Sequence, residues 1–170
     1  MAEYIKTKSI YPILVPQSCS LDVLKFPLHQ EGNSCSVYSC ANALLVMEVL
    51  AGGGLGFSAL DLYKELLAQK YTNYDPRKSV SVPAVLELMK QKMLIWKYRL
   101  IKNTPEDYKI KIVQGYPIIT VIQSPKRSHA VCTVKYDGNQ FVCYDSNKRD
   151  IYDGLPPFTE IKKSYIIHLT

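Results

Sequence analysis

The spacing of apolar residues in this chain changes once, from helical to extended, at about residue 117. Segments with helical signals come first, and β-branched runs separated by turns follow. Helices that precede strands in this way favour an α+β fold over alternating βαβ units. Because 170 residues correspond to one domain of ordinary size, we expect the helices and strands to share a single core.

The first helical segment, residues 35–51, is apolar on nearly every face and contains neither proline nor glycine. Such a helix is expected in the centre of a domain, where all of its sides are covered. Ser34 is its predicted N-cap, and the glycines of residues 52–56 end it. Three further helices are predicted at about residues 58–70, 82–92 and 104–115.

The later part of the chain predicts an antiparallel sheet. Its strands are expected at residues 117–123, 129–136, 140–145 and 163–169, with a weaker candidate at 93–102. The two middle strands flank the turn Asp137-Gly138-Asn139 and so predict a hairpin. The whole pattern predicts a central helix packed on a small C-terminal antiparallel sheet.

The N-terminal residues have a different character from the rest. Residues 1–28 contain three prolines among short apolar runs, which is typical of an extended arm that could carry one edge strand. We therefore expect an arm at 1–28 and a single domain at 29–170. The lone tryptophan, Trp96, is expected in the core of that domain.

Charge and cysteine usage exclude several classes of function. The net charge is +6, but the basic residues are scattered, so nucleic-acid binding is not expected. Neither a signal peptide nor an apolar run of about 18 residues is present, so we expect a cytoplasmic protein without a membrane partner. Delivery into a host cell as an effector remains an open alternative. Five cysteines at irregular spacings favour reduced thiols. Without a C-x-x-C pair or a tight Cys/His cluster, no metal or other cofactor is expected.

Three residues together predict thiol chemistry. Cys35 begins the buried helix after a polar loop, His129 begins a strand, and Asp145 ends the next strand. A thiol nucleophile, an imidazole base and a carboxylate that orients the base form a hydrolase triad. Cys40, within the apolar helix, is expected to be an ordinary core residue.

The hairpin gives this triad a testable geometry. With a three-residue loop at 137–139, His129 would face Asn147 and Asp145 would be its diagonal neighbour on the same face of the sheet. Such a loop needs a left-handed residue at Gly138 or at the asparagine after it. Asn147 remains the alternative to Asp145 as the group that orients the imidazole.

The surroundings of Cys35 suit an activated thiol. A cysteine in the first turn of a helix lies at the positive end of the helix dipole, and a nearby imidazolium would lower its pKa further. Gln30, five residues earlier, is placed to donate from its side-chain amide. Together with the Cys35 backbone N–H it could form an oxyanion hole.

The order of Gln30, the helix start Cys35-Ser-Val-Tyr-Ser-Cys-Ala-Asn-Ala, His129 and Asp145 resembles the papain-like superfamily of cysteine peptidases. The resemblance is closest to the compact branch that contains the double-glycine leader peptidases of bacteriocin export systems, and it covers about residues 28–148. It implies Cys35 as nucleophile, His129 as general base and acid, Asp145 as orienter and Gln30 as oxyanion donor. Ser36 departs from the family pattern, in which glycine is usual.

The resemblance implies hydrolysis of a peptide or isopeptide bond through a thioester intermediate. The substrate, a protein or peptide, would lie in the groove between helix and sheet. Two alternatives remain open at the level of sequence. The same triad serves transglutaminases, acyltransferases and amidases, and a catalytically inactive binding domain could keep the fold. The sequence leaves the oligomeric state undetermined.

Overall fold

A computed structural model of the chain describes residues 3–5, 13–15, 17–53, 58–70, 75–123, 125, 128–147 and 152–169. The helices in these ranges are α1 (Cys35–Leu50), α2 (Ala59–Lys70), α3 (Val82–Gln91), α4 (Pro105–Val113) and the short 3-10 helix η1 (Phe158–Glu160). The strands are β1 (Glu3–Ile5), β2 (Ile13–Val15), β3 (Cys19–Ser20), β4 (Lys97–Ile101), β5 (Ile118–Gln123), β6 (Ser128–Tyr136), β7 (Phe141–Tyr144), β8 (Tyr152–Gly154) and β9 (Ile161–His168).

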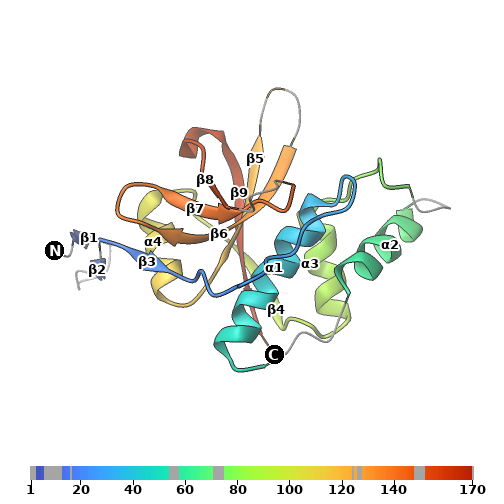
Figure 1. The fold of residues 1–170 in the computed structure, drawn as a ribbon, viewed down its shortest axis with the longest axis horizontal. Helices are drawn as coiled ribbons and strands as arrows, with labels where there is room; N and C mark the ends of the chain where they lie inside the picture. Colours follow the sequence, from blue (N-terminus) through green and yellow to red (C-terminus); the bar gives the residue numbers. More distant parts are fainter. Residues whose placement is uncertain are drawn as a thin grey trace.

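Seven of these strands form one antiparallel sheet in the order β4-β9-β5-β6-β7-β8, and β3 pairs with the far end of β6. β1 and β2 form a separate two-stranded sheet near the N-terminus (Figure 1), and β2 contacts α4. The expected α+β architecture is confirmed. The sheet is larger than the sequence pattern indicated, because β3 and β8 join it.

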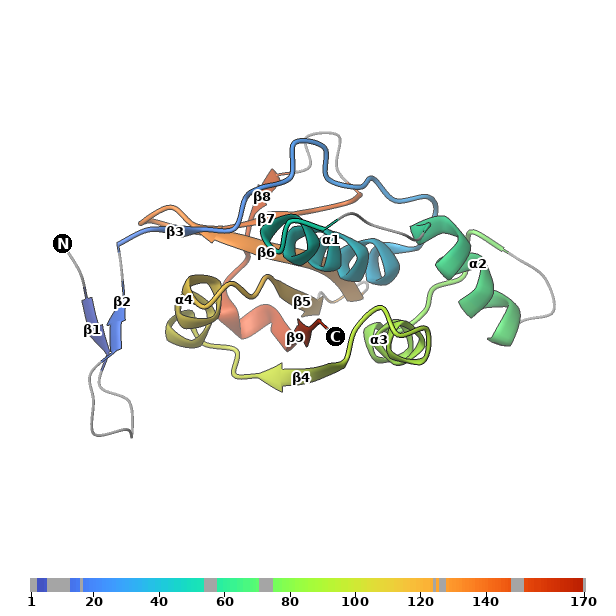
Figure 2. The ribbon, with the colours of Figure 1, turned by 90° about the horizontal axis from the view of Figure 1, so that it is seen from below.

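Helices cover both faces of the sheet (Figure 2). α1 packs on β6 and β5, and α2 and α3 pack against α1 and against each other. α4 lies on the opposite face, where it contacts β5 and β6. There the Tyr108 hydroxyl forms hydrogen bonds of 2.9 Å with Thr120 and 2.5 Å with Ser164, so the buried polar atoms of this layer are paired.

The central position of α1 follows from its composition. Val37, Cys40 and Ala41 are fully buried, and Leu44 is almost so. Residues 36–44 are buried on all sides, as expected for a central helix, whereas Val49 and Leu50 at its C-terminal end are exposed. Truncating a buried leucine such as Leu44 to alanine lowers the free energy of unfolding by about 2–5 kcal/mol. The buried side chains of α1 therefore contribute strongly to the stability of the core. Its N-terminus lies beside the end of the sheet at which β6 begins.

The β6–β7 hairpin differs from the expected geometry at its tip. Tyr136 pairs with Phe141, which leaves a loop of residues 137–140, one residue longer than predicted. A bulge at Val134 then shifts the register, and Thr133 pairs with Cys143 as expected. The prediction of a three-residue loop was wrong. Gly138, at φ +97°, is the left-handed residue that the turn needs.

One smaller expectation is met only in position, and another is wrong. Ser34 occupies the N-cap position of α1 but makes no side-chain cap bond, because its hydroxyl donates to the carbonyl of Glu31 instead. Trp96 is 61% exposed rather than buried. It precedes the edge strand β4, and the ammonium of Lys97 lies 4.3 Å from the centre of its ring.

Candidate active site

The thiol of Cys35 lies at the N-terminal end of the central helix. Cys35 is the first residue of α1 and is partly buried. Backbone N–H groups in the first turn of a helix have no partners within the helix and give this end a partial positive charge. The position therefore favours a thiolate over a neutral thiol.

His129 and Asp145 meet across the β6–β7 hairpin. Nε2 of His129 lies 2.9 Å from Oδ1 of Asp145, which is a hydrogen-bonded ion pair when the imidazole is protonated. The same carboxylate oxygen accepts a bond of 3.1 Å from the backbone N–H of Asn147. The Asp145 side chain is only 6% exposed. Asn147 is exposed and supports the carboxylate through its backbone, so the structure places Asp145, rather than the Asn147 side chain, against the imidazole.

The imidazole of His129 also bonds to the thiol. Hydrogen bonds with Asp145 and then with Cys35 raise the pKa of His129 to about 9, against the opposing effect of burial. Burial acts to raise the pKa of the Cys35 thiol. The hydrogen bond from His129 and the backbone of Ala130 outweigh that effect and lower the pKa. Because Nε2 is engaged by Asp145, Nδ1 is the nitrogen left to face the thiol.

Three other thiols have the opposite tendency. Burial raises the pKa of Cys19, Cys40 and Cys132. Cys40 lies in the interior of α1, as expected for a core residue. Among these four thiols, only Cys35 has an environment that favours the nucleophilic form.

Gln30 is fixed beside the loop that follows β7. Its amide nitrogen Nε2 donates to the carbonyl of Gly32 at 2.7 Å, and its Oε1 accepts from the Ser146 hydroxyl at 2.9 Å. The backbone N–H of Gln30 also donates to the carbonyl of Ser146 at 2.9 Å. Ser146 follows Asp145 directly, so these bonds join the segment before α1 to the end of β7. Within the described part of the chain, the second N–H of the Gln30 amide makes no hydrogen bond, and Gln30 does not line the cavity beside the thiol.

A cavity of about 430 Å³ opens beside Cys35 and His129. One wall is the segment that leads into α3, and the other is formed by β5 and β9. Besides the thiol and the imidazole, it is lined by Ser36, Ser79, Val80, Ser81, Val82, Pro83, Val121, Ser128, Ala130, Lys162, Lys163 and Tyr165. The space lies in the groove between helices and sheet, where the substrate was expected.

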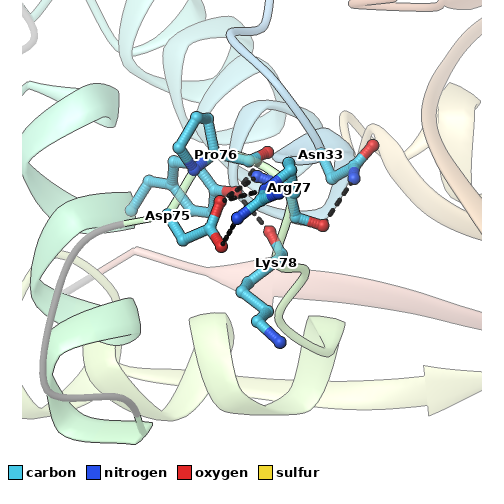
Figure 3. Close-up of polar contacts among 6 residues, drawn as sticks. Asn33, Asp75, Pro76, Arg77 and Lys78 are labelled. Atoms are coloured by element: carbon cyan, nitrogen blue, oxygen red, sulfur yellow. Dashed lines mark hydrogen bonds and ion pairs between the residues drawn. The ribbon is translucent and has the colours of Figure 1, made fainter.

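Polar contacts join the segment before the first wall to the loop that precedes Cys35 (Figure 3). The backbone N–H of Asn33 donates to the carbonyl of Pro76 at 2.9 Å. Its side-chain amide donates to the carbonyl of Arg77 at 2.7 Å. Residues 75–78 are therefore held against the loop just before Cys35, and the cavity wall that follows them is positioned relative to the thiol.

The same segment is fixed from two other sides. The hydroxyl of Tyr63, a buried residue of α2, donates to the carbonyl of Lys78. Gly32 has φ +56°, and a Cβ at this position would overlap the carbonyl oxygen of Pro76 and lie 2.8 Å from the Pro76 Cβ. Glycine is needed here both for its backbone conformation and for the close approach of the two loops.

The sequence predicts Cys35, His129 and Asp145 as a group, and the structure brings them together, but the sequence does not predict the cavity walls. Of residues 79–83, the pattern assigns only Val82 and Pro83, as the start of a helix, and Lys162 and Lys163 belong to the scattered basic residues. Ser81 is the one lining residue with a local signal, because a serine just before a predicted helix start is a typical N-cap. In the structure its Oγ accepts a hydrogen bond of 3.3 Å from the Ala84 N–H.

Neither a metal site nor a membrane span was found in the described ranges. Within them, no group of three or more His, Cys, Asp or Glu side chains is placed to hold a metal ion. No helix in the same ranges combines the length and the apolar character needed to cross a bilayer.

Comparison with known proteins gives likeness in structure but not in sequence. No protein-family model matches the chain, and no curated protein matches it by sequence. Xylellain, a cysteine protease from Xylella fastidiosa, superposes with a TM-score of 0.72 at 14% identity, over 92% of this chain and 87% of that one.

Two further solved structures are similar to this chain. A protein from Bacillus anthracis described as a C39-like peptidase has a TM-score of 0.63 at 12% identity, over 90% of this chain and 98% of its own. The peptidase domain of Streptococcus ComA, a bifunctional ABC transporter of a quorum-sensing pathway, has a TM-score of 0.56 at 14% identity, over 84% and 97%. At these identities the likeness concerns the fold. The chain therefore has the papain-like fold of these cysteine peptidases, as its sequence pattern predicted.

Proposed function

We propose that this protein is a cysteine peptidase that hydrolyses a peptide or isopeptide bond through Cys35, His129 and Asp145. The observation that carries the proposal is the continuous chain of hydrogen bonds from the Asp145 carboxylate through the His129 imidazole to the Cys35 thiol. These hydrogen bonds end at the thiol, which borders a cavity large enough for substrate side chains. The fold shared with other cysteine peptidases supports the same assignment.

The first half of the proposed reaction forms an acyl-enzyme. The Cys35 thiolate attacks the carbonyl carbon of the scissile bond, and the carbonyl π electrons move to oxygen. When the tetrahedral intermediate collapses, the C–N bond breaks and the nitrogen takes a proton from the His129 imidazolium. The amine product leaves, and the acyl group remains on sulfur as a thioester.

The second half releases the acid. Neutral His129 removes a proton from a water molecule, whose oxygen attacks the thioester carbonyl. The C–S bond then breaks, and the carboxylic acid product leaves while Cys35 and His129 return to the ion pair. Asp145 holds the imidazole in the orientation that both halves need and stabilises its charged form.

The oxyanion of each tetrahedral intermediate needs hydrogen-bond donors. The backbone N–H of Cys35, in the first turn of α1, is one proposed donor, because such groups lack a partner within the helix. The second N–H of the Gln30 amide is the other. The bonds from Gln30 to Gly32 and Ser146 support this role, since they restrain the side chain before substrate arrives.

A peptide-library digestion tests the proposal without knowledge of the substrate. Peptides derived from a whole proteome would be incubated with the protein, and new termini would be identified by mass spectrometry. We expect new termini with the wild type and with Cys19→Ala, a matched control because Cys19 is partly buried but lies outside the cavity. Cys35→Ala should produce none. Cleavage that persists in Cys35→Ala would contradict the assignment.

A further inference from the structure

The far wall of the cavity carries two consecutive lysines. Lys162 and Lys163 of β9 both line it, although neighbouring residues in a regular strand point to opposite faces of a sheet. The pairing of β9 with β5 explains this. Val121 pairs with Lys163 and Ile122 pairs with Ile161, so Lys162 is an extra residue without a partner on β5. A bulge of this kind can turn two successive side chains to one side.

The remaining lining leaves this charge uncompensated. No Asp or Glu is among the described residues that line the cavity. Lys162 and Lys163 are exposed, and neither forms an ion pair with any carboxylate in the described ranges. The charge of the His129 imidazolium is balanced by Asp145 and by the Cys35 thiolate, so the two lysines are the unpaired positive groups of the lining. Hydroxyl groups of Ser79, Ser81 and Ser128 complete a polar surface that suits an anion.

From this arrangement we infer that the cavity selects a substrate carboxylate next to the scissile bond, and that Lys162 and Lys163 determine this preference. The inference rests on the proposed peptidase function. The carboxylate could be the side chain of an Asp or Glu, or the free C-terminus of the substrate. In both cases the lysines contribute positive charge in a partly enclosed space, where charge pairs are stronger than on an open surface.

Alkylation of Cys35 by a matched pair of reagents tests the role of the lysines. Iodoacetate is an anion and iodoacetamide is neutral, and both report the same thiolate. The ratio of their rates therefore isolates the effect of charge in the cavity from the activation of the thiol. We expect the double variant Lys162→Met/Lys163→Met to lower the iodoacetate-to-iodoacetamide ratio by about fivefold. Lys163→Arg should retain most of the ratio, because it keeps the charge.

Lys102→Met is the matched control, since this lysine is exposed and does not line the cavity. It should leave the ratio unchanged. An equal ratio in the wild type and the double variant would overturn the inference, even where both reagents label Cys35 rapidly. Slow labelling by both reagents, with a midpoint near that of an ordinary thiol, would instead show that the proposed function fails, and the inference with it.

Peptide inhibitors identify the source of the carboxylate. Peptides with a thiol-reactive group would be compared as Glu and Gln pairs at each position around that group, and as free-acid and amide C-termini. A Glu preference that disappears in the double variant identifies an acidic side chain, and a free-acid preference that disappears identifies the C-terminus. If neither preference exists, the inference is wrong.

Discussion

Oδ1 of Asp145 lies 2.9 Å from Nε2 of His129, and the bond joins two strands of one hairpin whose register is set by a bulge. Without the bulge at Val134, the four-residue loop would shift the pairing by one position. A shift of one residue turns side chains to the other face of a strand. The position of the imidazole therefore depends on a bulge five residues further along β6.

Replacing Asp145 by Asn should change the pH dependence of catalysis. Hydrogen bonds with Asp145 and then with Cys35 raise the pKa of His129 to about 9, so the imidazolium persists until the pH rises through that value. An amide removes the charge, and the alkaline limb of kcat/KM should move to lower pH. We expect kcat to fall by about a hundredfold to ten-thousandfold. The measurement is a pH–rate profile on a substrate found by library digestion.

Asn147→Ala is the matched control for that experiment. Only the backbone of Asn147 contacts the Asp145 carboxylate, so removing its side chain should leave the profile close to that of the wild type. A large loss of activity in Asn147→Ala with little loss in Asp145→Asn would contradict the assignment of Asp145 as the orienting group.

Gln30→Ala should slow the chemical step without changing the thiol. Removing one oxyanion donor typically costs about a hundredfold to a thousandfold in kcat. Because the Gln30 side chain forms no hydrogen bond to Cys35 or His129, the pH dependence of Cys35 alkylation should stay the same. Ser146→Ala removes only the bond that restrains Oε1 of Gln30, and should cause a smaller loss. Equal kcat in Gln30→Ala and the wild type would exclude the oxyanion role.

Gly32→Ala should destabilise the fold and loosen the cavity. Its Cβ would overlap Pro76, and its φ of +56° is unfavourable for alanine. We expect a loss of about 1–3 kcal/mol in the free energy of unfolding, measured in urea. Gly52→Ala provides the comparison, because φ is +74° but nothing lies within 4 Å of its Cβ. If both variants lose the same stability, contact with Pro76 has no energetic role.

The arrangement of helices and strands was predictable because their signals are local. An apolar helix without glycine or proline is recognisable from residues 35–51 alone. The structure gives α1 as Cys35–Leu50, with the nucleophile candidate as its first residue. The pairing of His129 with Asp145 was also predictable, because both residues flank a single hairpin.

Features that depend on distant partners could not be predicted in this way. The bulges at Val134 and Lys162 arise from pairing between strands, and the sequence around either residue does not predict them. Residues 75–78, which precede the cavity wall, are held in place by contacts with Asn33 and Tyr63, which lie far away in the sequence. Trp96 was misplaced for a similar reason, because its exposure follows from its position beside the edge strand β4.

The most direct test of the central claim is the rate of Cys35 alkylation by iodoacetamide as a function of pH, in the wild type and in His129→Ala. Intact mass and peptide mapping would identify the labelled thiol. Because His129 lowers the pKa of Cys35, we expect wild-type labelling to begin well below the pH at which an ordinary thiol reacts. In His129→Ala the midpoint should rise to at least about 8.5. A wild-type midpoint near about 8.5 that does not change in the variant would contradict the account.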